Sequence, residues 1–185
     1  MIEISYGTMF TFISIMWCIN RAFVAWKNKR LNWKRELQLL LVYICIVVIV
    51  RFTFCPFGKI DGKIQPLLFD MEKMLPFRIN LLPFVYLFDY EVMGEAILNF
   101  VGNTLMFVPV GIVYPTVYKK LDTHIKVIAT GVGFSLAIEI LQLPFYDRVS
   151  DIDDLILNSL GYLLGYLIYL GVKNIKNKNK NCHDI

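Results

Sequence analysis

The sequence predicts an all-α protein: a polytopic membrane helix bundle with about five transmembrane helices and an outer interfacial or re-entrant segment. Composition is the first reason, because 57% of the 185 residues are hydrophobic and only 18% are charged, whereas a soluble domain carries about 25% charged residues. Length is the second reason, because several apolar stretches reach the roughly 20 residues that a helix needs to cross a bilayer. Little chain remains for a water-soluble core, so we expect residues 1–185 to form a single membrane domain.

The five predicted spans cover approximately residues 4–26, 37–54, 92–118, 125–144 and 152–172. Between the second and third spans, residues 75–90 read LPFRINLLPFVYLFDY. Proline interrupts this segment, and its many aromatic residues favour the headgroup level of a membrane. We expect it to lie along the outer interface or to dip into it, although an ordinary amphipathic loop fits the pattern equally well. We expect the lysine- and asparagine-rich residues 173–185 to form a mobile cytoplasmic tail.

The basic residues predict which way the chain crosses the membrane. Twelve lysines and arginines fall in the first connection, the third connection and the tail, whereas five fall in the long second connection and the short fourth one. The side richer in lysine and arginine is the cytoplasmic side. We therefore expect the N-terminus outside and the C-terminus in the cytoplasm. The basic tail fits this topology signal, so we expect no nucleic-acid partner.

The pattern of cysteines and histidines indicates neither a cofactor nor a metal site. The four cysteines form no C-x-x-C pair, and three lie in or beside apolar runs, as small buried side chains do. His124 falls in a predicted cytoplasmic connection and His183 in the tail, where we expect both to be solvated. The chain contains neither an H-E-x-x-H nor a G-x-S-x-G motif. We therefore expect no cofactor and no metal ion.

Polar residues recur at helical spacing in the last three spans. Side chains three or four residues apart lie on one face of a helix. Polar side chains are costly in hydrocarbon, so such a face usually points into the bundle or toward a water-filled cavity. The three polar stripes consist of Asn99 and Asn103 in the third span, Ser135, Glu139 and Gln142 in the fourth, and Asp151, Asp154 and Asn158 in the fifth, with Asp153 beside them.

The predicted orientation puts all three stripes near the outer ends of their spans. Arg148 lies in the short outer turn, and Arg78 and Asn80 lie in the outer connection. All these groups can meet at one depth. We therefore predict a polar pocket that opens toward the outer leaflet or the extracytoplasmic space.

A structural role for these residues is the alternative to a pocket. Polar side chains in membrane helices can hydrogen-bond across the bundle at about 1 kcal/mol each. Arg148 could form an ion pair with Asp151 or Asp154 at the start of the fifth span, where acids are favoured. Glu139 is the most informative residue, because a carboxylate at that depth needs a cation or must be protonated. The candidate cations are Arg51, Arg78 and Arg148.

Small residues and prolines predict local geometry in the third and fifth spans. Gly161 and Gly165 form a G-x-x-x-G pair, which is typical of close helix packing. Pro109 and Gly111 predict a kink in the third span.

Six short motifs follow one another through residues 75–165. They are RINLLPF from Arg78, NFVGN from Asn99, FVPVG from Phe107, S-x-x-x-E-x-x-Q from Ser135, R-x-x-D-x-x-D from Arg148 and N-x-x-G from Asn158. In order and spacing they resemble the VanZ-like membrane proteins, a family named for a teicoplanin-resistance protein. The resemblance covers about half of the chain, and the full set is specific although each motif alone is weak. The first two spans share only their hydrophobicity with the family.

The resemblance implies a role in the envelope of a bacterium, at its cytoplasmic membrane, without implying a reaction. Members of the family are associated with low-level resistance to teicoplanin and related lipid-bearing glycopeptides. We favour a non-catalytic protein that binds a membrane lipid, a lipid-linked cell-wall precursor or a lipoglycopeptide at the outer leaflet. Arg78 and Arg148 would then meet phosphate groups, and Asn80, Asn99 and Asn103 would provide polar recognition.

An intramembrane enzyme is the alternative from a different functional class. It would modify an envelope lipid or a cell-wall precursor, with Glu139 and Asp154 as acid and base or as metal ligands. Unchanged envelope lipids in cells that lack the protein would count against this hypothesis. A transporter and a subunit of a larger complex remain open, and the sequence names no protein partner.

Overall fold

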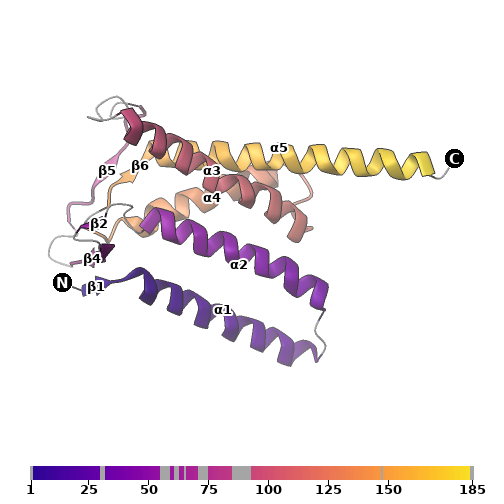
Figure 1. Cartoon of the computed structure of the whole chain (residues 1–185), viewed down its shortest axis with the longest axis horizontal. Helices are drawn as coiled ribbons and strands as arrows, with labels where there is room; N and C mark the ends of the chain where they lie inside the picture. The colour runs from indigo at the N-terminus through magenta and orange to yellow at the C-terminus, as the bar shows by residue number, and fades with distance from the viewer. Residues whose placement is uncertain are drawn as a thin grey trace. The chain divides into compact units, whose positions relative to one another are not determined.

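A computed structural model of the chain describes residues 2–29, 32–54, 59–60, 63–64, 66–70, 75–84, 93–146 and 148–183. Five of its helices are long and apolar enough to cross a membrane (Figure 1). The predicted all-α class with five spans is confirmed, and the chain is a multi-pass membrane protein. The helices are α1 (Tyr6–Asn28), α2 (Trp33–Phe54), α3 (Met93–Val117), α4 (His124–Gln142) and α5 (Ile152–His183).

The chain folds as two compact units. Unit 1 contains Met1–Leu81 and Ile138–Asp151, and unit 2 contains Leu82–Ala137 and Ile152–Ile185. Unit 1 therefore holds α1, α2 and the last turn of α4. Unit 2 holds α3, most of α4, and α5.

α1 begins at Tyr6 rather than near residue 4 because Ser5 caps it. Ser5 has an extended backbone, and its hydroxyl oxygen accepts a hydrogen bond of 3.1 Å from the backbone N–H of Thr8. A serine in this position satisfies one of the amides that the first turn of a helix leaves without a partner. Ile2–Ile4, which the sequence placed partly in the first span, forms strand β1 instead.

α1 and α2 form an antiparallel hairpin in unit 1 (Figure 1). The guanidinium of Arg21 makes two hydrogen bonds to the carboxylate of Glu36. Nε donates to Oε2 at 2.8 Å, and Nη2 donates to Oε1. Further along the pair, the hydroxyls of Ser14 and Tyr43 are hydrogen-bonded at 2.7 Å. Most apolar side chains of α1 are exposed, as lipid-facing side chains of a membrane helix would be.

Among the described residues, three pairs of short strands lie in unit 1, and the sequence analysis missed them. β1 pairs antiparallel with β4 (Leu67–Phe69), and β2 (Lys59–Ile60) pairs antiparallel with β3 (Lys63–Ile64). β5 (Ile79–Asn80) pairs in parallel with β6 (Ser150–Asp151), with Ile79 opposite Ser150 and Asn80 opposite Asp151. The predicted interfacial segment therefore contains a strand in its first half. Its second half, residues 85–90, lies outside the described residues.

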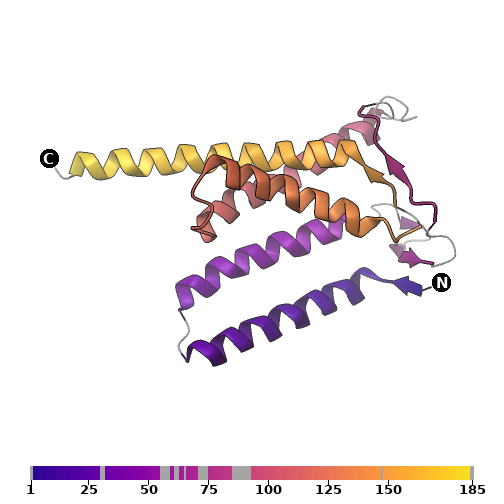
Figure 2. The ribbon, with the colours of Figure 1, turned by 180° about the vertical axis from the view of Figure 1, so that it is seen from behind.

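α3 and α5 lie side by side in unit 2, as Figures 1 and 2 both show. A Cβ atom added to Gly161 would overlap the carbonyl group of Thr104, and one added to Gly165 would overlap that of Val108. The predicted close packing at the G-x-x-x-G pair is confirmed. Gly111 of α3 has the reciprocal role, because a Cβ there would overlap the carbonyl of Tyr162. Gly111 therefore allows α3 and α5 to pack closely because it has no side chain. The kink predicted at Pro109 and Gly111 stays a prediction.

α4 and α5 face each other in unit 2 with an antiparallel register that three contacts define. The His124 Nδ1 atom and the Tyr166 hydroxyl lie 2.8 Å apart. The ring of Tyr162 covers Gly131, where a Cβ would overlap it. Ser135 meets Asn158 one turn further along. The contacts pair successively later residues of α4 with successively earlier residues of α5. The two helices are therefore antiparallel and contact each other along one face of each.

α5 extends well beyond the end predicted for the fifth span. The sequence analysis expected a mobile tail from residue 173, but the helix continues to His183. Lysine is a good helix former, and an exposed helix needs no apolar face once it has left the membrane. The long α5 can be followed to the C-terminal label in Figure 2.

Candidate functional site

The predicted site residues divide between the two units, and we call the set in each unit a polar cluster. The cluster of unit 1 contains Arg78, Asn80, Glu139, Gln142, Arg148 and Asp151. The cluster of unit 2 contains Asn99, Asn103, Ser135, Asp154 and Asn158. A single outward-facing pocket built from both clusters stays a prediction.

Asn80 and Asp151 form the centre of the cluster in unit 1. They are register partners in the parallel strand pair, and the Asn80 amide donates hydrogen bonds of 3.1 Å to both carboxylate oxygens of Asp151. Asn80 is buried, although it lies in a segment whose other residues are exposed. Its amide therefore joins the outer connection to the α4–α5 turn through a hydrogen bond to a charged group, which is a strong type.

Glu139 contacts the same strand from the last turn of α4. Its Oε2 atom accepts a hydrogen bond of 3.0 Å from the backbone N–H of Asp151. The side chain is buried, with 4% of its surface exposed. Glu139 therefore satisfies a backbone donor just before the start of α5, and the Asp151 side chain is turned toward Asn80.

Gln142, one turn after Glu139 on α4, hydrogen-bonds to the end of α2. Its amide donates a hydrogen bond of 2.8 Å to the backbone carbonyl of Thr53. Thr53 belongs to the last turn of α2, where carbonyl groups have no partner within the helix. The buried amide of Gln142 supplies that partner. The pattern of polar side chains could not reveal this contact, because every residue carries a carbonyl.

Arg78 lies on the exposed side of the same region. Its guanidinium stacks over the ring of Tyr146, with Cζ 4.2 Å from the ring centroid. Its backbone carbonyl accepts a hydrogen bond of 3.0 Å from the N–H of Ser150. Arg51, another cation considered for Glu139, lies over the ring of Tyr6 at 5.6 Å. Arg148 is half-buried, and its backbone N–H donates to the carbonyl of Phe145.

In unit 2, Asn103 connects two of the predicted stripes. Its amide donates to Asn99 Oδ1 at 2.7 Å, one turn earlier on α3, and also to the Asp154 carboxylate on α5. The carboxylate of the neighbouring Asp153 accepts a hydrogen bond of 2.8 Å from the backbone N–H of Phe84. Asp153 was noted beside the stripe but not assigned to the site.

Ser135 and Asn158 form a fully buried polar contact between α4 and α5. The Asn158 amide donates to the Ser135 hydroxyl at 3.1 Å, and neither side chain is exposed. One turn further along α5, the hydroxyl of Tyr162 is also buried. Among the described residues, neither this hydroxyl nor Asn158 Oδ1 has a hydrogen-bond partner. The polar stripe of α5 therefore extends past Asn158 to Tyr162 and Tyr166, which the sequence analysis did not include.

A metal site or an acid–base pair requires suitable side chains close together. No three His, Cys, Asp or Glu side chains within the described part of the chain are grouped closely enough to hold a metal ion. The two carboxylates proposed for catalysis belong to different units, and each accepts a hydrogen bond, Glu139 from Asp151 and Asp154 from Asn103. The enzymatic alternative stays a prediction.

A family model described as VanZ/LLP1 matches residues 40–174 of the chain. The chain belongs to the VanZ/LLP1 family. The resemblance seen in its motifs is therefore confirmed. No curated protein and no solved structure matches the chain.

The match shows which parts of this VanZ/LLP1 protein belong to the family region. It begins in α2 and ends in α5, so it extends beyond the residues 75–165 that carry the recognised motifs. Every candidate site residue of both clusters lies within it, whereas α1 lies before it. The polar clusters are thus features of the VanZ/LLP1 region of the chain.

Proposed function

We propose that this VanZ/LLP1 protein binds a lipid-bearing ligand at the outer leaflet of a bacterial cytoplasmic membrane. The ligand would be a membrane lipid, a lipid-linked cell-wall precursor or a lipoglycopeptide such as teicoplanin. Binding without catalysis would reduce the access of the antibiotic to its target or support the envelope. The proposal rests on one surface of unit 1, the outer strip, which we define as residues 75–81.

The outer strip combines exposed apolar side chains with one buried polar side chain. Its backbone is extended at β5 (Ile79–Asn80), where successive side chains point in opposite directions. Leu75, Phe77, Ile79 and Leu81 are all exposed, the last with 71% of its surface, whereas Asn80 is buried against Asp151. A row of exposed apolar side chains marks a site of contact with a membrane or ligand. An acyl chain is a suitable occupant of this row.

Arg78 adds a cation to the same strip. Its Cζ atom lies over the ring of Tyr146, 4.2 Å from the ring centroid. A guanidinium held in this way is suited to bidentate bonds with a phosphate or carboxylate. The bond from Ser150 to the Arg78 carbonyl fixes the backbone beneath it. The combination favours a ligand that carries both an anionic group and an acyl chain.

The contacts around Asn80 hold the outer strip in place. The parallel strand pair, the amide of Asn80 and the carboxylate of Glu139 hold the outer connection against the α4–α5 turn. A surface prepared before binding loses less entropy when the ligand arrives. In the proposal, Asn80, Asp151 and Glu139 therefore position the strip, while Arg78 and the apolar row contact the ligand.

Expression in a susceptible Gram-positive host that lacks the protein tests the proposal. The wild-type chain should raise the teicoplanin concentration needed to stop growth, and Arg78→Gln should remove most of that effect. Lys176→Gln, an exposed basic residue of α5, is the matched control and should retain it. Purified protein in nanodiscs should bind teicoplanin about tenfold more weakly after Arg78→Gln, because a hydrogen bond between charged groups is lost.

Two outcomes would contradict binding at the outer strip. Equal susceptibility of cells with and without the wild-type protein would exclude the resistance role. A new or missing envelope lipid in mass spectra of the expressing cells would favour the enzymatic alternative instead.

A further inference from the structure

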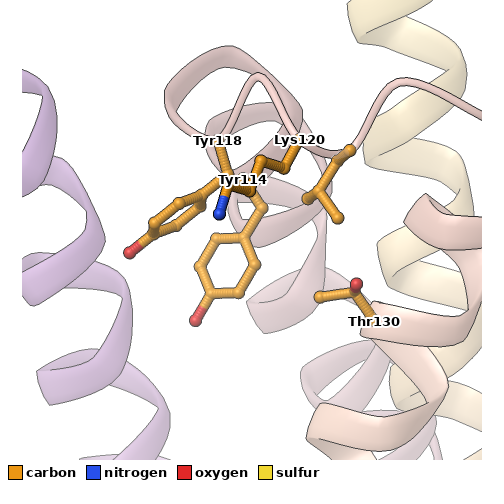
Figure 3. Close-up of a pocket in the computed structure, with 5 residues that line it drawn as sticks. Tyr114, Tyr118, Lys120 and Thr130 are labelled. Carbon is orange, nitrogen blue, oxygen red and sulfur yellow. The ribbon is translucent and has the colours of Figure 1, made fainter.

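A hollow of about 310 Å³ lies in unit 2, where α3 ends and α4 begins. Its lining consists of Tyr114 and Tyr118 from the end of α3 and the residue after it, Lys120 and Leu121 from the connection, and Thr130 from α4. Figure 3 shows the two tyrosine rings on one side of the hollow and Thr130 on the other, with the Lys120 side chain extending beside the rings. None of these residues belongs to either polar cluster.

The tyrosine wall of the hollow is held in place by other rings. Tyr114 and Tyr118 are four residues apart, and their rings meet edge to face at 5.6 Å. The ring of Tyr114 also packs against the rings of Phe134 and Tyr162, with ring centroids 5.8 Å and 6.3 Å apart. Tyr162 is buried between α3, α4 and α5. The aromatic side of the hollow is therefore fixed before any ligand binds.

The connection at the hollow carries a positive charge. Residues 118–126 contain Lys119, Lys120 and Lys126 but a single acid, Asp122. The Asp122 carboxylate is bonded to the Lys126 ammonium at 2.7 Å. The remaining two lysines give this end of the helices a net charge of about +2, which attracts anions at the membrane surface at about 1 kcal/mol per basic residue.

The position of the hollow along the helices matches the headgroup level. The connection joins the candidate spans Ile97–Val117 and His124–Gln142, so it lies at a membrane boundary. Tyrosine is enriched at this level, because its ring is apolar and its hydroxyl is polar. A lysine beside it can extend its ammonium toward lipid phosphate while its methylene groups stay in an apolar environment.

We propose that this hollow binds an anionic phospholipid. Its phosphate would lie against Lys120 and the tyrosine hydroxyls, and the first part of an acyl chain would lie along Leu121 and the ring faces. The volume of the hollow is at the lower end of the range for small-molecule sites, so it accommodates a headgroup and not a whole lipid. This site is independent of the outer strip and of the function proposed for it.

Native mass spectrometry of the full-length protein, released from detergent micelles with added lipid, tests the proposal. Phosphatidylglycerol should bind the wild-type protein about tenfold more tightly than phosphatidylcholine with the same acyl chains. Lys120→Gln should remove that preference, and Lys120→Arg should keep it. Lys119→Gln is the matched control, because it removes the same charge from the neighbouring residue, which does not line the hollow. It should change the affinity less than twofold.

Three outcomes would overturn the proposal. The first is an equal loss of affinity in Lys119→Gln and Lys120→Gln, which would indicate general surface charge. The second is the absence of any preference for phosphatidylglycerol in the wild-type protein. The third is displacement of the lipid by glycerol phosphate at equal concentration, which would indicate a site for a soluble phosphate. Lys120 is exposed, so unchanged thermal unfolding of each variant is expected and separates lost binding from lost folding.

Discussion

Asn80 lies opposite Asp151 in the parallel pair of β5 and β6, and its amide donates to both oxygens of the Asp151 carboxylate at 3.1 Å. This contact joins two segments that are 71 residues apart in the sequence. Neither strand is longer than two residues, so side-chain bonds must contribute much of the stability of the pair.

Asn80→Ala is expected to destabilise the protein through this contact. The variant leaves the Asp151 carboxylate without its amide donor, and a hydrogen bond to a charged group contributes about 1.5 to 3 kcal/mol. Denaturant unfolding of the full chain in mixed micelles measures the loss. Asn174→Ala, at an exposed position of α5, should change the free energy of unfolding by less than about 0.5 kcal/mol. A double-mutant cycle with Asp151→Ala that showed no coupling would contradict the contact.

Gly161→Ala should weaken the packing of α3 on α5. The added methyl group would overlap the carbonyl of Thr104, so the two helices must separate locally, and overpacking of this kind costs about 1 to 3 kcal/mol. Gly171 is the matched control on the same helix, because a Cβ there meets nothing within 4 Å. Gly171→Ala should leave stability unchanged or raise it by up to about 1 kcal/mol, since alanine favours helix. Equal melting temperatures of the two variants would be incompatible with the close approach.

Ser135→Ala should destabilise the protein, whereas Ser159→Ala should not. The Ser135 hydroxyl accepts a hydrogen bond of 3.1 Å from the buried amide of Asn158. Loss of the hydroxyl leaves that donor without this partner and should lower the free energy of unfolding by about 0.6 to 2 kcal/mol. The hydroxyl of Ser159 is buried and has no partner among the described residues. Removing it should be neutral or stabilising, because an unsatisfied buried hydroxyl is itself costly. Thermal unfolding of the two variants under one condition compares them directly, and a larger loss in Ser159→Ala would refute this assignment.

The carboxyl group of Asp122 should titrate below its ordinary pKa of 3.8. The hydrogen bond from Lys126 is the main cause of the lowered pKa, and the charge of that lysine adds to it. Because the folded pKa is depressed, the small stabilisation from this pair is present above pH 3.8 and is lost as the pH falls through the folded pKa. A carbon-detected NMR titration of the aspartates measures it. In Lys126→Gln the pKa of Asp122 should return toward 3.8, and an unchanged value would show that the pair is not formed in the membrane mimetic.

The orientation can be tested with single cysteines in a chain whose native cysteines are replaced by serine. A membrane-impermeant maleimide should label Leu81→Cys in intact cells, because the outer strip is expected to face outward. Lys176→Cys should be labelled only after the cells are permeabilised, because positive residues favour the cytoplasmic side. Both positions are exposed, so access depends on the side of the membrane. The reverse pattern would invert the predicted topology and place the proposed ligand site in the cytoplasm.

The spans were predictable because length and hydropathy alone define them. The contacts that lie on helix faces were partly predictable: Asn99, Asn103 and Asp154 lie on stripes with helical spacing, and the structure brings all three together. The spacing could not show that Ser135 meets Asn158, because the periodicity of a helix does not give its register against a neighbour.

The strand pairs and the backbone contacts were not predictable. A strand of two residues has no measurable period, so the pairing of β5 with β6 left no pattern in the sequence. The stacking of Arg78 on Tyr146 joins two loop residues far apart in the chain. The tail was expected to be mobile because it is polar, whereas α5 continues to His183, since lysine is a good helix former.

The bond between Gln142 and Thr53 has a consequence for how the protein is made. A ribosome releases the N-terminal part of a chain first, and membrane helices begin to assemble while synthesis continues. The carbonyl at the end of α2 receives its amide donor from a residue 89 positions further on. Until that residue emerges, the end of α2 must rely on water or lipid headgroups for a donor, since hydrocarbon offers none. The first hairpin therefore reaches its final form only after the fourth helix has entered the membrane.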